Sequence, residues 1–166
     1  MVEAAATTFK NTYIAVVRVR GDALLSPHIK KTFKITKLYG KNYCVVIPNT
    51  PEFLGIIQRI KDHTTFGEIS SDTFLKLLQK RGRLAGNKPL TDDYVKQKLR
   101  LDIKQFVAEF FAAKQKLENI PGLKTFFRLH PPIGGFERAG IKKNYAVGGA
   151  LGYRGKYINK LIERMI

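Results

Sequence analysis

One pattern occurs twice in the first 69 residues and constrains the fold more than any other feature of the chain. A run of mostly β-branched residues at 13–20 (YIAVVRVR) precedes Ser26-Pro27, and a similar run at 43–47 precedes Thr50-Pro51. Such runs are typical of strands. A Ser or Thr followed by Pro favours a helix start, with the first residue as N-cap and Pro at the first helical position. The pattern therefore predicts two strand-to-helix units.

Apolar spacing supports both predicted helices. Ile29, Phe33 and Leu38 can share one face of the first helix, which we expect Gly40 to end. The second helix places apolar residues at i, i+3, i+4 and i+7. A third strand is expected at 65–69, which gives β-α-β-α-β. The residues that we expect to be buried in this core are Val16, Val45, Phe53, Ile56, Ile57 and Ile60.

The remaining chain has a different character. Short helices are expected at 74–80 and after Thr91, whose cap would place Asp92 and Asp93 in the first helical turn. A longer helix near 103 would end at Pro121-Gly122, a strand would cover 126–130, and a helix would close the chain. We predict an α+β protein: a flexible tail at 1–12, a core at 13–69 and a helical, loop-rich extension at 70–166.

Charge narrows the class of partner. Lys and Arg number 30 against 13 Asp and Glu, a formal net charge of +17 with a pI near 10.1. This imbalance favours polyanions, either nucleic acid or an anionic membrane surface. No apolar run reaches the roughly 18 residues that span a bilayer, and the first residues do not have the pattern of a signal peptide. The single cysteine, Cys44, excludes an internal disulfide framework and fits a reducing compartment.

The segment 124–156 combines three kinds of residue that contact RNA. It holds seven glycines, seven Lys or Arg, several aromatic residues and one acid, Glu137. Glycine lets the backbone approach a partner closely, basic residues neutralise phosphates, and aromatic rings stack on unpaired bases. A second basic stretch, 80–88, contains no acid. We therefore interpret both stretches as RNA-binding rather than as incidentally charged loops.

Catalytic patterns are missing from these stretches. A phosphate-binding P-loop fails because Ala150 stands where the first glycine is required and Tyr157 where Ser or Thr would bind magnesium. The three histidines are far apart and there is no second cysteine, so a zinc site is not predicted. His130 could serve as a general acid, but a hydrogen-bonded structural role is the preferred interpretation. We predict no catalytic residue, no metal site and no cofactor.

Long segments resemble the large-subunit ribosomal protein family called "L thirty" in bacteria and archaea and "L seven" in eukaryotes. They include AVVRVRG (15–21), CVVIPNTPEFLGIIQRIKD (44–62), KRGRLAGNKPLTDDYV (80–95), PGLKTFFRLHPPIGGFERAGIKK (121–143) and GGALGYRGKYINKLI (148–162). The resemblance implies a β-α-β-α-β core with an antiparallel sheet related to ferredoxin-like folds. The extension is similar to that of the archaeal and eukaryotic branch, which bacterial members lack, and the short tail is more similar to archaeal members than to eukaryotic ones. The resemblance also implies a cytoplasmic structural protein on large-subunit ribosomal RNA, beside neighbouring ribosomal proteins, without catalysis, cofactor, membrane or small-molecule substrate.

The family's RNA contacts are carried over to the two best-matching stretches. The resulting RNA-binding residues are Lys80, Arg81, Arg83, Asn87, Lys88, Arg128, His130, Arg138, Lys142, Lys143, Tyr153, Arg154 and Lys156. Lys30, Lys31, Lys34 and Lys37 match an ordinary helix and are weaker candidates. A free-standing RNA chaperone or translational regulator is the alternative function. An RNA-modifying enzyme would need a cofactor pocket that the sequence does not indicate.

The lack of a period in 133–156 leads to one more hypothesis. Ordering a backbone residue costs about 1–2 kcal/mol, and this loop has few regularly spaced apolar residues to offset that. We hypothesise that the loop is mobile alone and becomes ordered on RNA. Replacing Arg154 and Lys156 by alanine should then weaken RNA binding and leave thermal stability nearly unchanged.

Overall fold

A five-stranded sheet with the order β4-β2-β1-β3-β5 forms the middle layer of the protein. The computed structural model describes residues 13–23 and 25–166, so the predicted tail lies outside the described residues. The strands are β1 (Tyr13–Arg18), β2 (Tyr43–Pro48), β3 (Thr64–Glu68), β4 (Phe126–Arg128) and β5 (Gly152–Tyr153). β1, β2, β3 and β4 pair antiparallel, whereas β3 and β5 are parallel, so the whole sheet is mixed. The α+β class is confirmed.

The central strand β1 is buried on both faces, which explains its nearly continuous apolar sequence. Side chains alternate across the sheet. Ala15 and Val17 therefore pack into one apolar cluster, while Ile14 and Val16 pack into the other. Val16 lies opposite Val45 on β2 and opposite Phe66 on β3. The three strands of the predicted core thus give each face of the sheet its own apolar layer.

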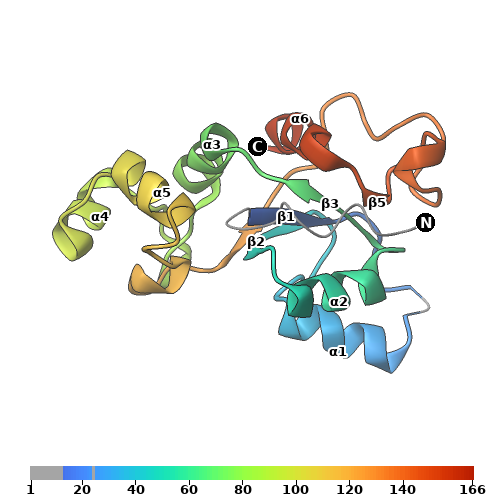
Figure 1. Cartoon of the computed structure of the whole chain (residues 1–166), viewed down its shortest axis with the longest axis horizontal. Coiled ribbons are helices and arrows are strands. Elements are labelled where there is room, and N and C mark those ends of the chain that lie inside the picture. The colour runs from blue at the N-terminus through green and yellow to red at the C-terminus, as the bar shows by residue number, and fades with distance from the viewer. Residues whose placement is uncertain (1–12, 24) are drawn as a thin grey trace.

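Helices α1 (Pro27–Ile35) and α2 (Pro51–Ile60) cover one face and begin where the sequence predicts (Figure 1). The Ser26 hydroxyl accepts a hydrogen bond from the Ile29 N–H at 3.4 Å, and the Thr50 hydroxyl accepts one from the Phe53 N–H at 3.5 Å. These bonds satisfy backbone donors at the start of each helix. α1 ends at Ile35, several residues before Gly40.

The buried face of α2 is narrower than the spacing rule predicts. Ile57 is 1% exposed and Ile60 is fully buried, in agreement with the prediction. Phe53 and Ile56 are only partly buried, so the prediction that they belong to the buried core was wrong. A ten-residue helix lying on a sheet buries the residues nearest the sheet, and flanking apolar positions stay at the rim.

Helices from the C-terminal part cover the opposite face, where α3 (Ser71–Arg81) and α6 (Ile158–Met165) pack together. α5 (Ile103–Phe111) packs against α3, and α4 (Asp92–Leu99) lies beyond it at one end of the molecule (Figure 1). Phe110 joins these helices to the sheet, because the centre of its ring lies 4.7 Å from the centre of the Phe74 ring and 4.1 Å from the centre of the Tyr13 ring. Aromatic pairs at such distances add packing energy beyond buried area.

The predicted end of the long helix was wrong. α5 ends at Phe111 rather than at Pro121-Gly122, because Ala113 takes a left-handed φ of 58°. The Lys114 N–H then bonds back to the Glu109 carbonyl at 2.9 Å, which closes the helix end. Four short 3₁₀ segments complete the structure: η1 (Ala85–Asn87), η2 (Leu117–Asn119), η3 (Tyr145–Val147) and η4 (Gly155–Tyr157).

The C-terminal part also supplies both edge strands of the sheet. β4 pairs with β2 at one edge, and β5 pairs with β3 at the other. The chain beside β5 approaches β3 closely: a Cβ on Gly67 would lie 2.1 Å from the Gly155 carbonyl oxygen. Glycine at position 67 therefore permits this backbone packing.

Candidate nucleic-acid interface

The RNA-binding residues predicted from the sequence fall beside the two opposite edges of the sheet. The turn 80–88 and Arg128 lie toward the β4 edge, since this turn bonds to the chain that leads into β4. The loop 133–156 passes through β5 near its end, at the other edge of the sheet. The structure therefore groups the predicted residues into two basic surfaces, one at each edge, and not into one continuous site.

Backbone hydrogen bonds hold the turn 80–88 in a fixed shape. The Leu84 N–H donates to the Lys88 carbonyl at 2.8 Å, which closes the turn upon itself. The Ala85 N–H donates to the Gly122 carbonyl and the Lys124 N–H donates to the Arg83 carbonyl, both at 2.9 Å. These bonds attach the turn to the segment before β4. Asn87 and Lys88 are exposed at its tip, where they can meet a partner.

Arg81 and Arg83 differ from Lys80 and Lys88 in exposure. Lys80 and Lys88 are exposed, whereas both arginines are half-buried. Arg81 donates from one terminal nitrogen to the Ile166 carbonyl at 2.5 Å, while its Nε is buried and has no hydrogen-bond partner within the described residues. Burial, together with the nearby Arg83 charge, lowers the pKa of Arg81. Arg81 therefore connects the turn to the end of α6 in addition to carrying charge.

Arg128 and His130 continue the surface along the β4 edge. Arg128 is the residue opposite Tyr43 in the β2–β4 pair, and its side chain is exposed. The His130 N–H donates to the Met165 carbonyl at 2.9 Å, which fixes the backbone while the side chain stays exposed. Backbone bonds thus hold both residues in place while their side chains are exposed at the surface.

The loop 133–156 is folded back upon itself. The Tyr145 N–H donates to the Leu151 carbonyl at 2.7 Å, and the Leu151 N–H donates to the Lys143 carbonyl at 3.1 Å. Ala150 and Leu151 are buried in a small apolar cluster with Val19. These contacts give the loop an internal structure that its sequence, without a period, did not predict.

Arg154 is the centre of this loop and departs from the sequence prediction. Its side chain is only 3% exposed and forms a two-bond ion pair with Glu137, with the second bond at 2.9 Å. Further bonds run from Arg154 to the Thr65 hydroxyl at 3.1 Å and to the Ala150 carbonyl at 3.2 Å. The guanidinium also lies 4.5 Å from the centre of the Tyr145 ring.

These contacts give Arg154 an internal structural role. Its guanidinium donors are directed at the protein, so we correct the expectation that Arg154 faces RNA. Arg154 is held inside because the single acid of the loop, Glu137, is half-buried and needs a cation beside it. Burial raises the pKa of Glu137, but its hydrogen bonds from Arg154 and the backbone, with the arginine charges, outweigh burial and lower that pKa overall.

Tyr153 presents its ring to solvent while its hydroxyl is engaged. The side chain is 58% exposed. The hydroxyl donates to Glu68 Oε1 at 2.5 Å, and this bond, with burial and the Glu68 charge, raises the pKa of Tyr153 to about 12. The hydroxyl therefore stays protonated and fixes the ring at the β5 edge, with one face available for stacking.

The remaining basic residues of the loop are exposed cations. Arg138, Lys142, Lys143 and Lys156 all have exposed side chains. In the described part of the chain, none of them forms an ion pair, and neither do Lys80, Arg83, Lys88 and Arg128. Unpaired surface cations are the groups that phosphates neutralise on binding.

Sequence reasoning missed two residues that extend the β5-edge surface. Tyr157 is 59% exposed, and the Lys160 ammonium lies 5.7 Å from the centre of its ring. Their i, i+3 spacing at the start of α6 was the available signal, because such residues share one helix face. They place an aromatic ring and a cation beside Lys156.

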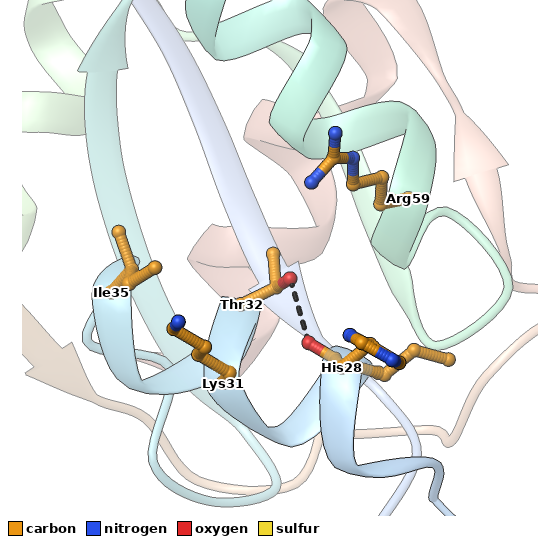
Figure 2. A pocket seen from close by; sticks show the side chains of 6 residues that line it. His28, Lys31, Thr32, Ile35 and Arg59 are labelled. Carbon is orange, nitrogen blue, oxygen red and sulfur yellow. Dashed lines mark hydrogen bonds between the residues drawn. The ribbon is translucent and has the colours of Figure 1, made fainter.

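The lysines of α1 lie apart from both surfaces. Lys31 lines a hollow of about 530 Å³ between α1 and α2, together with His28, Ile29, Thr32, Ile35 and Arg59 (Figure 2). In this hollow the Thr32 hydroxyl donates a hydrogen bond to the His28 carbonyl at 3.0 Å, so the proton of this hydroxyl is already used within the protein. Lys30 and Lys34 are exposed on the same helix.

Other chemistry finds little support in the described residues. Cys44 is buried in the apolar core, and this burial raises the pKa of its thiol to about 12. Over the ranges 13–23 and 25–166, no group of three or more His, Cys, Asp or Glu residues is placed to hold a metal ion. No helix in the same ranges combines the length and apolarity needed to cross a bilayer.

Similarity to known proteins agrees with the resemblance noted in the sequence. No protein-family model matches the chain. A "Large ribosomal subunit protein uL30" of Methanopyrus kandleri is 49% identical over 149 residues, which cover 89% of this chain and 100% of that protein. Proteins of the same name from Methanococcus maripaludis and Archaeoglobus fulgidus are 45% and 44% identical, over 92% and 91% of this chain and 98% of each relative. The chain belongs to the uL30 family of large ribosomal subunit proteins, in its archaeal branch.

Proposed function

We propose that this protein is a structural constituent of the large ribosomal subunit in the cytoplasm. It binds large-subunit ribosomal RNA, contacts neighbouring ribosomal proteins and takes part in translation and subunit assembly, with no catalytic role and no cofactor. One observation carries this proposal: the 49% identity to an archaeal uL30 protein along that protein's whole length. The net charge of +17 supports a polyanionic partner independently.

We further propose that RNA binds to the two basic surfaces at the sheet edges. The β4-edge surface consists of Lys80, Arg81, Arg83, Asn87, Lys88, Arg128 and His130, and the β5-edge surface of Arg138, Lys142, Lys143, Tyr153, Lys156, Tyr157 and Lys160. The exposure of all these residues except the half-buried Arg81 and Arg83, and the lack of ion pairs at the basic residues named above, support phosphate contacts. Two surfaces at opposite edges would let one protein join separate RNA segments.

We also propose that the chain divides into a core at 13–69 and an extension at 70–166. Residues 13–69 form a β-α-β-α-β unit that we relate to ferredoxin-like folds, since β2, β1 and β3 are antiparallel and α1 and α2 lie on one face. Residues 70–166 are an extension that carries both proposed RNA-binding surfaces. The extension also covers the second face of the sheet, so we expect the two parts to unfold together.

Sedimentation of ribosomes tests the proposed function. A tagged copy of the protein should travel with the large subunit through a sucrose gradient and stay bound at moderate salt. A free-standing RNA chaperone would instead remain near the top of the gradient. Recovery of the protein only in the light fractions would contradict the proposal.

Charge reversal tests the two surfaces separately. We expect Arg83→Glu with Lys88→Glu, and Lys142→Glu with Lys143→Glu, each to reduce incorporation into the large subunit. The matched control is Lys104→Glu with Lys114→Glu, which changes the net charge equally at exposed positions of the extension that belong to neither surface. Equal losses in all three variants would show that only net charge matters and would overturn the assignment of the surfaces.

A further inference from the structure

A second hollow lies beside the β4 edge, and Lys37 is the one lining residue that was named above as an RNA-binding candidate. Its volume is about 340 Å³, within the range of small-ligand sites, ~300–1,000 Å³. Its lining comes from the segment after α1 and from the chain before and within β4. The lining residues are Lys37, Tyr39, Glu118, Ile120, Gly122, Leu123, Lys124, Thr125 and Phe126.

Two of the lining residues, Tyr39 and Phe126, form an aromatic cluster with Tyr43. Tyr43 and Phe126 are stacked with ring centres 5.5 Å apart, and Tyr39 meets the Phe126 ring edge-on, also at 5.5 Å. Tyr43 and Phe126 are half-buried against the apolar layer under α1 and α2, while Tyr39 is 51% exposed. The two inner rings therefore hold an exposed ring in place, so little ordering is needed when a flat group stacks on it.

Cations surround these rings. The Lys37 ammonium donates to the Thr125 hydroxyl at 2.8 Å, which fixes it across the hollow. Lys124 lines the hollow. Arg128 lies directly opposite Tyr43 in the β2–β4 pair, so the side chains of Arg128 and Tyr43 share one face of the sheet. Glu118 is the one acid among the lining residues.

We propose that Tyr39, supported by Tyr43 and Phe126, is a stacking site for an unpaired RNA base, with the adjacent phosphates bound by Lys37, Lys124 and Arg128. The inference rests on the proposed function and specifies the RNA: a single-stranded segment rather than a duplex. Aromatic rings beside cations are the arrangement that binds single strands. A protein partner would favour a contact region depleted of lysine, so the surrounding cations favour RNA.

Fluorescence with a short single-stranded RNA that carries 2-aminopurine tests the site directly. Stacking should quench the probe on binding to the wild-type protein. We expect Tyr39→Ala to weaken binding by roughly 5- to 150-fold, the range for one lost base stack. Tyr39→Phe keeps the ring and should stay within about twofold. The matched control, Ile35→Ala, removes an apolar side chain that is 64% exposed on the adjacent helix and should change nothing.

Two further variants test the phosphate contacts. Lys37 has a left-handed φ of 59°, so Lys37→Gly removes the charge at a position whose backbone favours glycine. Combined with Lys124→Gln, this change should make the negative slope of log affinity against log salt shallower by about 0.7 per lost phosphate contact. An unchanged slope, or equal affinity of the wild type and Tyr39→Ala for the probe, would overturn the site.

Ultraviolet crosslinking of purified large subunits separates this site from the proposed function. The predicted result is a nucleotide adduct on the peptide that contains Tyr39, from an RNA segment that is unpaired. An adduct between this peptide and another protein, or with duplex RNA, would overturn the stacking site while the protein remained a subunit constituent. If the protein does not sediment with the subunit, the proposed function itself fails.

Discussion

The Arg154 guanidinium lies between the Glu137 carboxylate, with which it forms an ion pair, and the ring of Tyr145, whose centre is 4.5 Å away. This arrangement joins the beginning, middle and end of the loop 133–156. It also explains why the loop, despite its seven glycines and its lack of a period, has a defined shape. The single acid of the loop has its partner inside the protein, which leaves the exposed lysines of the loop without an acidic partner among the described residues of the loop.

Arg154→Ala should destabilise the protein. We expect a loss of at least ~1.5–3 kcal/mol in the free energy of unfolding, the usual contribution of one hydrogen bond to a charged group. The control is Lys156→Ala, whose side chain is exposed and should leave stability nearly unchanged. Urea unfolding of both variants measures this. Equal stability of the two variants would contradict the internal role of Arg154.

The ion pair also predicts a dependence of stability on pH. The pKa of Glu137 is lower in the folded protein than its ordinary value of 4.5. The folded state therefore binds this proton less readily than the unfolded state. Stability from the pair is fully present above pH 4.5 and is lost as the pH falls through the lowered pKa. Unfolding curves at neutral and acid pH should show a smaller acid-induced loss for Glu137→Gln than for the wild type. An equal acid-induced loss would show that Glu137 does not contribute.

The close approach of β3 to the chain after β5 gives a third prediction. Gly67→Ala would place a methyl group 2.1 Å from the Gly155 carbonyl oxygen, so the edge of the sheet must shift. We expect a loss of about 1–3 kcal/mol, as for other overpacked sites. Gly55→Ala is the control, because an added methyl group in α2 would meet nothing within 4 Å beyond its chain neighbours and the helix's own backbone. It should gain about 0.5–1 kcal/mol from its helical position. Similar effects of both changes on thermal unfolding would contradict the packing.

Two neighbouring isoleucines test the orientation of α2. Ile57→Ala should cost roughly 2–5 kcal/mol, because the side chain is 1% exposed beneath the helix. Ile56→Ala should cost clearly less, since Ile56 is only partly buried. Chemical unfolding of the two variants gives the comparison. A larger loss for Ile56 than for Ile57 would mean that the helix is rotated about its axis.

Local signals in the sequence predicted the core elements well. The caps at Ser26 and Thr50 form the hydrogen bonds expected of them, because capping depends on residues three apart. The end of α5 escaped prediction, since Ala113 adopts a left-handed conformation that alanine rarely takes. Local pattern alone therefore located helix starts better than helix ends.

Long-range pairing was beyond the sequence signals. β5 has only two residues and pairs in parallel with β3. The paired residues Thr65 and Gly152 are 87 positions apart in the sequence. The burial of Arg154 has the same origin, because its partner Thr65 comes from a distant strand. Composition identified the basic surfaces, but composition alone does not distinguish a buried arginine from an exposed one.

Crosslinking in cells, followed by sequencing of the attached RNA, tests the claim that the protein is bound to large-subunit ribosomal RNA. We expect the crosslinked reads to come overwhelmingly from large-subunit ribosomal RNA and to gather at a few fixed positions. We also expect the variant Lys142→Glu with Lys143→Glu to lose a subset of these positions, because we propose that each edge surface binds its own RNA segment. Reads spread over many messenger or transfer RNAs, without fixed positions in large-subunit ribosomal RNA, would contradict the claim.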